Sequence, residues 1–212
     1  MKYPSRPLQL LFPMLGLSLT LSLVNASDQP AVDDGPSVAT FAGGCFWCTE
    51  SDFEKLEGVN KVISGYTGGS LENPTYSQVS GGRTQHIESV QVHYDPDVIN
   101  YDQLLNAFWK MVNPTDDGGQ FVDRGYQYST AIFVHDPKQQ AAAEASLKAL
   151  SQSGRYDEPL VTPIRQAGTF YPAEEYHQDY YKKSPVRYRF YRWNSGRDQY
   201  LKKTWGDEVL HK

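Results

Sequence analysis

The stretch VATFAGGCFWCTESDFEKLEGV, residues 38–59, changes its pattern at two adjacent glycines. Before them lies a short apolar run typical of a β-strand. After them, Phe46, Phe53 and Leu56 are candidate apolar positions of a helix, which Gly58 is expected to end. The two glycines allow the backbone to turn sharply. We therefore predict a strand, a tight turn and a helix, with a pair of cysteines at the turn.

The same alternation continues along the chain. Short apolar runs predict further strands, and longer segments with periodic apolar residues predict helices. The expected strands are 59–69, 84–96, 128–136 and 159–168, and the expected helices are 101–112, 137–154 and 172–184. This order indicates a single α/β sandwich with helices packed on a sheet. We interpret RYRFYRW, residues 187–193, as a surface strand or sheet edge with its arginines outward, and the tail as wrapping the domain.

The N-terminus has the pattern of a secretory signal peptide over residues 1–26. Lys2 and Arg6 form a short basic start, an apolar run follows, and the letters VNA precede Ser27 as a cleavage site. An uncleaved membrane anchor is the alternative, because the run approaches the length of a bilayer crossing. Pro13 within the run and the VNA site favour cleavage. We therefore expect an exported protein, periplasmic or secreted, with no stable membrane insertion after cleavage.

Cleavage would leave 186 of the 212 residues, enough for one domain with a substantial core. We assign 27–37 to a flexible polar leader, 38–207 to one folded domain and 208–212 to a short tail. Loss of the two positive charges of the removed segment changes the formal net charge from −5 to −7. An acidic chain binds polyanions poorly, so we expect no nucleic-acid partner. We also expect a monomer.

Cys45 and Cys48 are the only cysteines in the sequence. Two cysteines three positions apart close almost no loop, so a disulfide between them cannot brace a domain of this size. Cys45 stands where the helix begins, and there the unpaired N–H groups and the helix dipole favour a thiolate. Cys48 follows one turn later on the same side, so the spacing allows a short disulfide between them. The pair indicates a redox-active or nucleophilic cysteine.

Three other interpretations of the pair stay open at this point. The thiols could be inert, they could be half of a metal site, or they could belong to a thioredoxin-like disulfide exchanger. A metal site is disfavoured because the five histidines are scattered, with no second paired motif. Phe46 and Trp47 disfavour the exchanger, because two large rings beside a sulfur form a pocket that suits a methyl group or a soft sulfur.

The letters GCFWCTE, residues 44–50, closely resemble the active-site motif of the A-type peptide methionine sulfoxide reductases. The agreement runs from about residue 38 to at least residue 181. Four further blocks resemble the family in the expected order: NPTYSQV (73–79), GGRTQHIESVQVHYDP (81–96), DRGYQYSTAIF (123–133) and FYPAEEYHQDYY (170–181). The resemblance implies a ferredoxin-like two-layer α/β sandwich, in agreement with the alternation above. It also makes 38–207 the catalytic domain.

The resemblance implies roles for individual positions. Cys45 attacks the sulfoxide sulfur, and Glu88 protonates the sulfoxide oxygen. Tyr76 and Tyr128 hold that oxygen with their hydroxyl groups, and Asp123 is a further active-site carboxylate. A sulfoxide oxygen leaves poorly until it is protonated, so the acid must keep its proton near neutral pH. Burial beside aromatic rings and a second carboxylate would raise the pKa of Glu88 in that direction.

Phe46 and Trp47 are implied to form the pocket for the substrate's S-methyl group. The chain departs from many relatives of the family because no cysteine follows Cys48, which occupies a position that is often glycine. We therefore predict that Cys48 attacks oxidised Cys45, and that an external dithiol protein, such as a thioredoxin-like protein, reduces the resulting disulfide. If Cys48 does not resolve Cys45, an outside thiol does so directly.

The activity implied is reduction of methionine S-sulfoxide in oxidised proteins and as the free amino acid, without a metal or an organic cofactor. It would repair oxidative damage. The rival hypothesis is a thioredoxin-like thiol–disulfide exchange protein.

Overall fold

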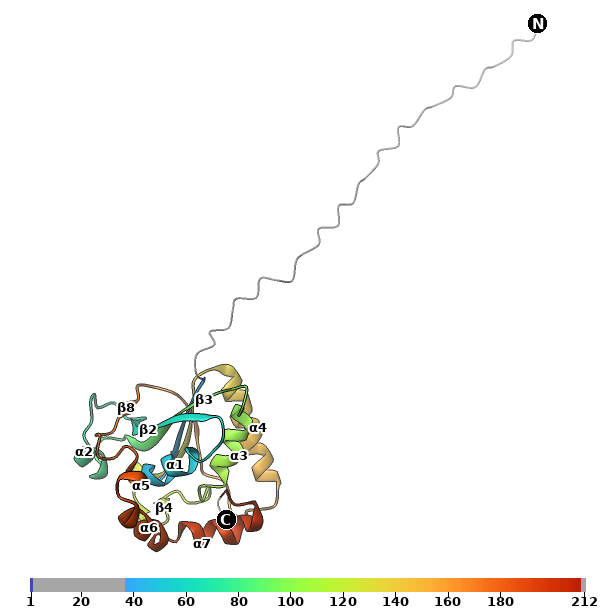
Figure 1. The fold of residues 1–212 in the computed structure, drawn as a ribbon. Coiled ribbons are helices and arrows are strands. Elements are labelled where there is room, and N and C mark those ends of the chain that lie inside the picture. Colours follow the sequence, from blue (N-terminus) through green and yellow to red (C-terminus); the bar gives the residue numbers. More distant parts are fainter. Residues whose placement is uncertain (2–36, 211–212) are drawn as a thin grey trace. The chain divides into compact units, whose positions relative to one another are not determined.

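The computed structural model describes residues 1 and 37–210 (Figure 1). Apart from Met1, the predicted signal segment and the leader before residue 37 lie outside the described residues. Residues 37–210 fall within one compact unit. In this described part of the chain, no helix has both the length and the apolar character needed to cross a membrane.

A mixed sheet forms the centre of the domain, with the strand order β7-β6-β1-β3-β2-β8 (Figure 1). Its strands are β1 (Ser37–Gly43), β2 (Val59–Thr67), β3 (Ile87–Tyr94), β6 (Thr130–Val134), β7 (Ile164–Gln166) and β8 (Tyr171–Pro172). Strands β6 and β7 run parallel, and the other neighbours are antiparallel. A separate small hairpin pairs β4 (Gly119–Gln120) with β5 (Asp123–Arg124).

Helical elements connect and cover the strands. They are α1 (Phe46–Phe53), α2 (Tyr76–Ser80), α3 (Tyr101–Trp109), the 3₁₀ turn η1 (Tyr126–Tyr128), α4 (Pro137–Gln152), α5 (Tyr180–Lys183), α6 (Pro185–Asn194), α7 (Arg197–Trp205) and the 3₁₀ turn η2 (Gly206–Glu208). The C-terminal helices stay with the domain, because Leu201 and Trp205 of α7 belong to its main apolar cluster.

The main core lies on one face of the sheet. Side chains alternate along β1, so Ala39 and Phe41 join the large apolar cluster, whereas Ala42 belongs to a smaller one. The Phe41 ring stacks on Phe53 of α1 at 5.0 Å and on Phe108 of α3 at 5.1 Å, measured between centroids. Helices packed on one face of a sheet form a two-layer sandwich, which confirms the predicted fold class.

Local sequence explains where the longer helices begin. Asn100 caps α3: its side chain accepts the N–H of Gln103, and the Gln103 side chain accepts the N–H of Asn100, each at 2.9 Å. Helix α4 starts with Pro137 directly after Asp136, whose carboxylate accepts the N–H of Gln139 at 2.8 Å. Both helices lie where the sequence predicts them.

Helix α1 is shorter than predicted. It ends at Phe53, and the chain continues through a turn in which the N–H of Leu56 donates to the carbonyl of Phe53 at 3.0 Å. Gly58 has a φ of +87°, so it turns the chain into β2 instead of closing the helix.

The helix predicted over 172–184 is wrong for most of its length. Only α5, Tyr180–Lys183, is an α-helix there. The Gln178 side chain bonds both the N–H and the carbonyl of Ser64 in β2, at 2.9 and 2.8 Å. Asp179 has a φ of +54°, which interrupts any continuous helix. Side-chain bonds to the neighbouring strand therefore outweigh the helical pattern.

The interpretation of residues 187–193 as a strand is also wrong, because this segment forms most of α6. Tyr188 and Arg192 are buried, whereas Val186 and Phe190 are exposed. In a strand Tyr188, Phe190 and Arg192 would share one face, so the burial of the first and last with Phe190 exposed shows a helical period. The arginines are not all outward, since Arg192 points into the protein.

Candidate active site

Cys45 lies at the turn between β1 and α1. Gly44 has a φ of +81°, and a Cβ at this position would lie 2.5 Å from the Cβ of Gln120, so only glycine fits this turn. Cys45 is the N-cap of α1, with non-helical backbone angles, and its carbonyl accepts the N–H of Cys48 at 3.1 Å. The thiol therefore sits at the start of the helix, as predicted.

A small cavity of about 130 Å³ opens at this thiol. Its lining residues are Cys45, Phe46, Trp47, Tyr76, Glu88, Asp123, Tyr128 and Tyr191. The cavity thus brings together every side chain that the sequence assigned to the site except Cys48, and it adds Tyr191. Cys45 is 6% exposed, and Cys48 is fully buried behind it.

Glu88 is a buried carboxyl group that lines the cavity. It lies on β3 with the same side-chain parity as Val90 and Val92, so the strand directs it to the helix-covered face. Its Oε2 accepts the N–H of Phe46 at 3.1 Å. Burial raises the pKa of Glu88 to about 8, and the charge of Asp123 contributes to the rise. Glu88 therefore holds a proton at neutral pH.

Tyr76 and Tyr128 present hydroxyl groups to the cavity. Tyr76 opens α2, and its N–H donates to Glu174 Oε1 at 2.8 Å, while the hydroxyl of Tyr66 donates to Oε2 at 2.8 Å. Burial and the charge of Glu88 raise the pKa of Tyr76 to about 12 and also raise the pKa of Tyr128. Both hydroxyls stay protonated and can donate. Glu174 positions Tyr76 through this bond. The sequence analysis did not identify it as a site residue, because nothing in its motif indicates a contact with Tyr76.

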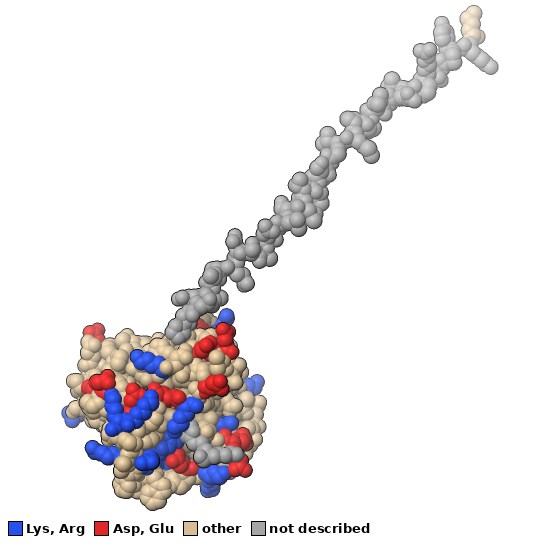
Figure 2. Space-filling view, in the orientation of Figure 1, with Lys and Arg blue, Asp and Glu red and all other residues tan. Residues whose placement is uncertain are grey.

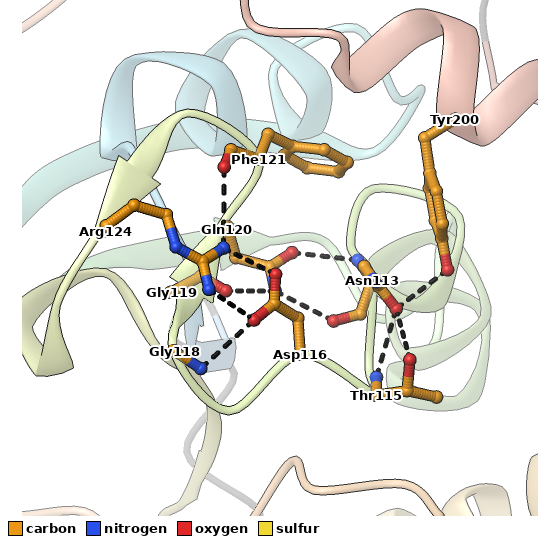
Figure 3. A network of polar contacts seen from close by, with 9 residues as sticks. All are labelled: Asn113, Thr115, Asp116, Gly118, Gly119, Gln120, Phe121, Arg124 and Tyr200. Atoms are coloured by element: carbon orange, nitrogen blue, oxygen red, sulfur yellow. Dashed lines mark hydrogen bonds and ion pairs between the residues drawn. The ribbon is translucent and has the colours of Figure 1, made fainter. Parts of the chain in front are cut away.

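The β4–β5 hairpin that carries Asp123 is held by a polar network (Figure 3). The side chain of Gln120 donates to the carbonyl of Asn113 at 2.8 Å and accepts its N–H at 2.8 Å. Arg124 makes two contacts with the carboxylate of Asp116, at 2.6 and 2.8 Å. These bonds close the loop on both sides of Asp123 and limit its movement.

Tyr191 of α6 donates its hydroxyl hydrogen to Oδ2 of Asp123. Burial raises the pKa of Asp123, although this bond and the charge of Arg197 oppose the rise. Sequence reasoning missed Tyr191 because residues 187–193 were interpreted as a strand. If this segment is interpreted as a helix, Tyr188, Tyr191 and Arg192 lie on one face, which would be expected to pack against the rest of the domain.

Aromatic contacts hold Trp47 in place. Its indole stacks on Tyr180 at 3.8 Å and meets the edge of Tyr191 at 5.8 Å. Its Nε1–H donates to Nδ1 of His177 at 3.0 Å, and the His177 ring also packs on Phe46 at 5.0 Å. Burial lowers the pKa of His177 to about 4, so the ring is neutral and Nδ1 is free to accept. His177 therefore orients Trp47 besides filling space.

Comparison with known proteins identifies the family. The family model described as "Peptide methionine sulfoxide reductase" matches residues 37–209. The "Peptide methionine sulfoxide reductase MsrA" of Bacillus licheniformis is 55% identical over 169 residues, which cover 80% of this chain and 93% of that protein. The chain belongs to the peptide methionine sulfoxide reductase A family.

Further relatives agree with this assignment. The reductase is 52% identical over 200 residues to the "Peptide methionine sulfoxide reductase MsrA/MsrB" of Vibrio cholerae, covering 92% of this chain but only 53% of that longer protein. Two solved structures are also similar, each at 31% identity. One is Mxr1 from Saccharomyces cerevisiae in reduced form, with a TM-score of 0.66; the match covers 73% of this chain and 88% of that one. The other is the methionine sulfoxide reductase A of Corynebacterium diphtheriae, with a TM-score of 0.63; the match covers 75% of this chain and 78% of that one.

The surroundings of the two thiols in the reductase shift their pKa values in opposite directions. Burial raises the pKa of Cys45 well above its ordinary value, and Cys48, Glu88 and Asp123 raise it further. Desolvation therefore opposes the preference for a thiolate that the start of the helix gives Cys45. The hydrogen bond from Cys45 lowers the pKa of Cys48, and the charge of Arg197 adds to the effect.

One cluster of carboxylates in the described part of the reductase has the spacing of a metal site. Oxygen atoms of Glu50, Glu54 and Asp179 lie within 4.8 Å of one another. The ammonium of Lys182 already bridges two of them, at 2.6 Å from Glu54 and 2.7 Å from Asp179. None of these carboxylates lines the cavity at Cys45. The cluster therefore serves to join α1 to α5.

Proposed function

We propose that this reductase converts methionine S-sulfoxide, in proteins and as the free amino acid, to methionine at the Cys45 cavity. One observation carries the proposal: a single small cavity joins a thiol, a carboxyl group that keeps its proton at neutral pH, and two phenol hydroxyls. Reduction of methionine sulfoxide needs a thiol at the sulfur of the substrate, and proton and hydrogen-bond donors at its oxygen. Phe46 and Trp47 supply the apolar wall for its methyl group.

In the first step, the sulfur of Cys45 attacks the sulfoxide sulfur. Tyr76 and Tyr128 donate hydrogen bonds to the sulfoxide oxygen, and Glu88 protonates it as charge develops there. The sulfoxide oxygen is transferred to the sulfur of Cys45, which becomes a sulfenic acid. The thiol loses one proton and the new hydroxyl group carries one, so the number of protons does not change. The sulfoxide is reduced by two electrons to methionine, and Cys45 is oxidised by two.

In the second step, Cys48 attacks the sulfenic acid. Cys45 is the N-cap of α1 and Cys48 is its third residue, the two positions whose groups meet in a capping box. The two thiols are also hydrogen-bonded to each other, which supports formation of a bond between their sulfurs. The S–S bond forms as the S–O bond breaks, and the hydroxyl leaves as water with the proton of Cys48. Both cysteines are free thiols in the structure, which is the form that meets the substrate.

An external dithiol protein of the thioredoxin type then reduces the disulfide and becomes oxidised itself. The cycle balances with thiols alone, so we propose no metal and no organic cofactor. The signal-peptide pattern of residues 1–26 supports action outside the cytoplasm, in the periplasm or secreted, as repair of oxidised proteins. Fractionation of expressing cells, with sequencing of the mature N-terminus, tests the location: an intact residue 1 in the cytoplasm would contradict it.

The activity is tested by incubating the reduced protein with racemic methionine sulfoxide and a small dithiol. We expect methionine to form until about half of the racemate is consumed, because the reductase acts on one epimer. Cys45→Ser should form none. Full consumption of both epimers would refute the stereochemistry. Reduction of insulin disulfides without any methionine formed would instead support the thioredoxin-like exchanger.

A further inference from the structure

Arg197, the first residue of α7, is a cation enclosed by the protein. It is 1% exposed, and its guanidinium donates to the carbonyl of Met111 at 2.5 Å and to the carbonyl of Gly43 at 2.9 Å. The ring of Phe121 covers the guanidinium, with its centroid 4.5 Å from the guanidinium carbon. Carbonyl oxygens and an aromatic face stabilise a cation, but they do not cancel its charge.

Two arginines are buried in the part of the chain that the structure describes, and only one of them has a counter-charge. Arg192 has the carboxylates of Asp52 and Asp198 at 2.6 and 2.8 Å. Arg197 has no carboxylate within ion-pair distance among residues 37–210, and its Nε has no hydrogen-bond partner there. Burial of an unpaired charge is costly, so a nearby group that gains negative charge would offset this cost.

The guanidinium of Arg197 lies beside the turn that leads into the cysteine helix. Gly43 is the last residue of β1, and a Cβ on Gly44 would lie 3.2 Å from Nη2 of Arg197. Cys48 stands in the first turn of the helix that starts there, and it is fully buried. The charge of Arg197 acts on two acidic groups: it favours the thiolate of Cys48, and it opposes the rise that burial causes in the pKa of Asp123.

We propose that Arg197 is the counter-charge of a thiolate on Cys48, and that it thereby prepares Cys48 to attack oxidised Cys45. The proposal rests on the function proposed above, because it concerns the resolving step. In that step the S–S bond forms as the S–O bond of the sulfenic acid breaks, and the hydroxyl group leaves as water with the proton that Cys48 has lost. The sulfur of Cys48 is oxidised and that of Cys45 is reduced, so no other oxidant is needed. Arg197 does not line the cavity, so it acts through Cys48 as a positioning residue.

The other charges near Cys48 do not replace that of Arg197. The hydrogen bond from Cys45 lowers the pKa of Cys48 to about 7, burial opposes this effect, and the charges of Arg197 and then Arg192 add to it. Asp52 raises the pKa of Cys48, so it acts against its own partner Arg192. On the face seen in Figure 2, basic and acidic side chains are interspersed at the surface, where water and salt screen them.

Titratable groups from other elements also face the thiol of Cys48. They are Glu88 of β3 and Tyr188 and Tyr191 of α6. Burial raises the pKa of each of these groups, that of Glu88 to about 8, so all three keep their protons at neutral pH. Neutral groups do not repel a thiolate. Arg197 is therefore the cation beside Cys48 whose charge no described neighbour cancels.

The test follows one turnover of the reduced protein without a reductant, by rapid acid quench. Methionine reports the first step, and alkylation of the quenched protein reports the second, because Cys48 can be alkylated beside a sulfenic acid but not in the disulfide. Arg197→Gln keeps hydrogen-bond donors without the charge. It should leave methionine formation unchanged, slow disulfide formation at pH 7 about tenfold, and move the pH profile of that step upward by about one unit. Arg197→Lys keeps the charge and should follow the wild-type profile.

Arg155→Gln is the matched control. The guanidinium of Arg155 also donates to a backbone carbonyl, that of Thr204 at 2.7 Å, and also lies over an aromatic ring, that of Trp205 at 3.9 Å. It is not among the charges that act on Cys48. Both steps and the pH profile should therefore stay as in the wild type.

Three results would overturn the proposal. Slower methionine formation with an unchanged second step would make Arg197 the counter-charge of Asp123 instead. Equal slowing of both steps with an unmoved pH profile would reduce its role to packing. The same upward shift in Arg197→Lys as in Arg197→Gln would show that the hydrogen bonds matter and the charge does not.

A second measurement applies if circular dichroism shows that Arg197→Gln does not fold. In Cys45→Ser the new hydroxyl can still donate to Cys48, so the ultraviolet absorbance of the Cys48 thiolate should appear below the ordinary thiol pKa of 9.0. A thiolate that forms only above this pH would overturn the proposal. Failure of the unmodified protein to form any methionine would refute the proposed function itself, which is a separate result.

Discussion

Arg192 of α6 and Asp52 of α1 form an ion pair inside the protein, with Nη1 2.6 Å from Oδ1. Asp52 lies on the helix that carries Cys48, and Arg192 is the neighbour of Tyr191, whose hydroxyl bonds Asp123. The pair therefore fixes a C-terminal helix against the cysteine helix and sets the position of one wall of the cavity. Residues 140 positions apart in the chain meet here.

Asp52→Asn should lower the free energy of unfolding by roughly 3 kcal/mol, because it removes the buried charge partner of Arg192 and leaves this guanidinium only the exposed Asp198. Asp198→Asn is the matched control, since Asp198 binds the same arginine at 2.8 Å but is largely exposed, and it should cost less than about 1 kcal/mol. Urea denaturation measures both. Equal losses in the two variants would contradict a special role for the buried pair.

Glu88→Gln should slow single-turnover formation of methionine by about 100-fold or more, because glutamine cannot give a proton to the sulfoxide oxygen. Its amide oxygen can still accept the N–H of Phe46. Glu50→Gln is the control: Glu50 is also a buried carboxyl with a raised pKa, about 7, but it does not line the cavity. Rapid quench with counting of methionine checks this, and similar rates for both variants would remove Glu88 as the acid.

The thiol of Cys45 should be slow to alkylate near neutral pH. Burial raises its pKa well above 9.0, so the rate with iodoacetamide in Cys48→Ser should still be rising beyond pH 9. Adding Glu88→Gln should move the profile to lower pH, because it removes the negative charge of the carboxylate beside the sulfur. A plateau near pH 7 in the single variant would show that the helix dipole outweighs desolvation after all.

Cys48→Ser should preserve one turnover per enzyme and abolish recycling by a thioredoxin-type protein. The sulfenic acid still forms on Cys45, but no internal thiol remains to convert it to a disulfide. Methionine yield in the absence and presence of the dithiol protein measures the two steps. Undiminished multiple turnover would show that an outside thiol attacks Cys45 directly.

Glu50 should make stability depend on pH. Its pKa rises from 4.5 to about 7 on folding, so the folded state binds this proton more tightly than the unfolded chain does. Its contribution is present below pH 4.5 and is lost as pH rises through about 7, a change of roughly 3 kcal/mol. Relative to wild type, Glu50→Gln should become more stable over this range. Exposed Glu57→Gln, as control, should run parallel to wild type.

The sequence predicted the fold class and most of the cavity. The strand, glycine turn and helix around Cys45 depend on backbone freedom and on apolar spacing, and both can be read within a short window. Glu88, Tyr76, Tyr128 and Asp123 were found through motifs that resemble the family. Their convergence on one cavity is a property of the folded chain.

The role of Tyr191 in the cavity and the secondary structure of residues 172–193 could not be predicted in the same way. The turns before α5 depend on Gln178 bonding Ser64, more than a hundred positions away, and α6 depends on burying Arg192 against Asp52. Local propensity contains no information about such distant partners.

The amino-acid sequence alone determined which chemical groups this reductase possesses and that the cysteines begin a helix, because these depend on residue type and on neighbours in the chain. Only the tertiary structure decided how their surroundings bias their charge: burial raises the pKa of both Glu88 and Cys45. Both follow from desolvation, and how much water a side chain loses depends on which distant segments cover it.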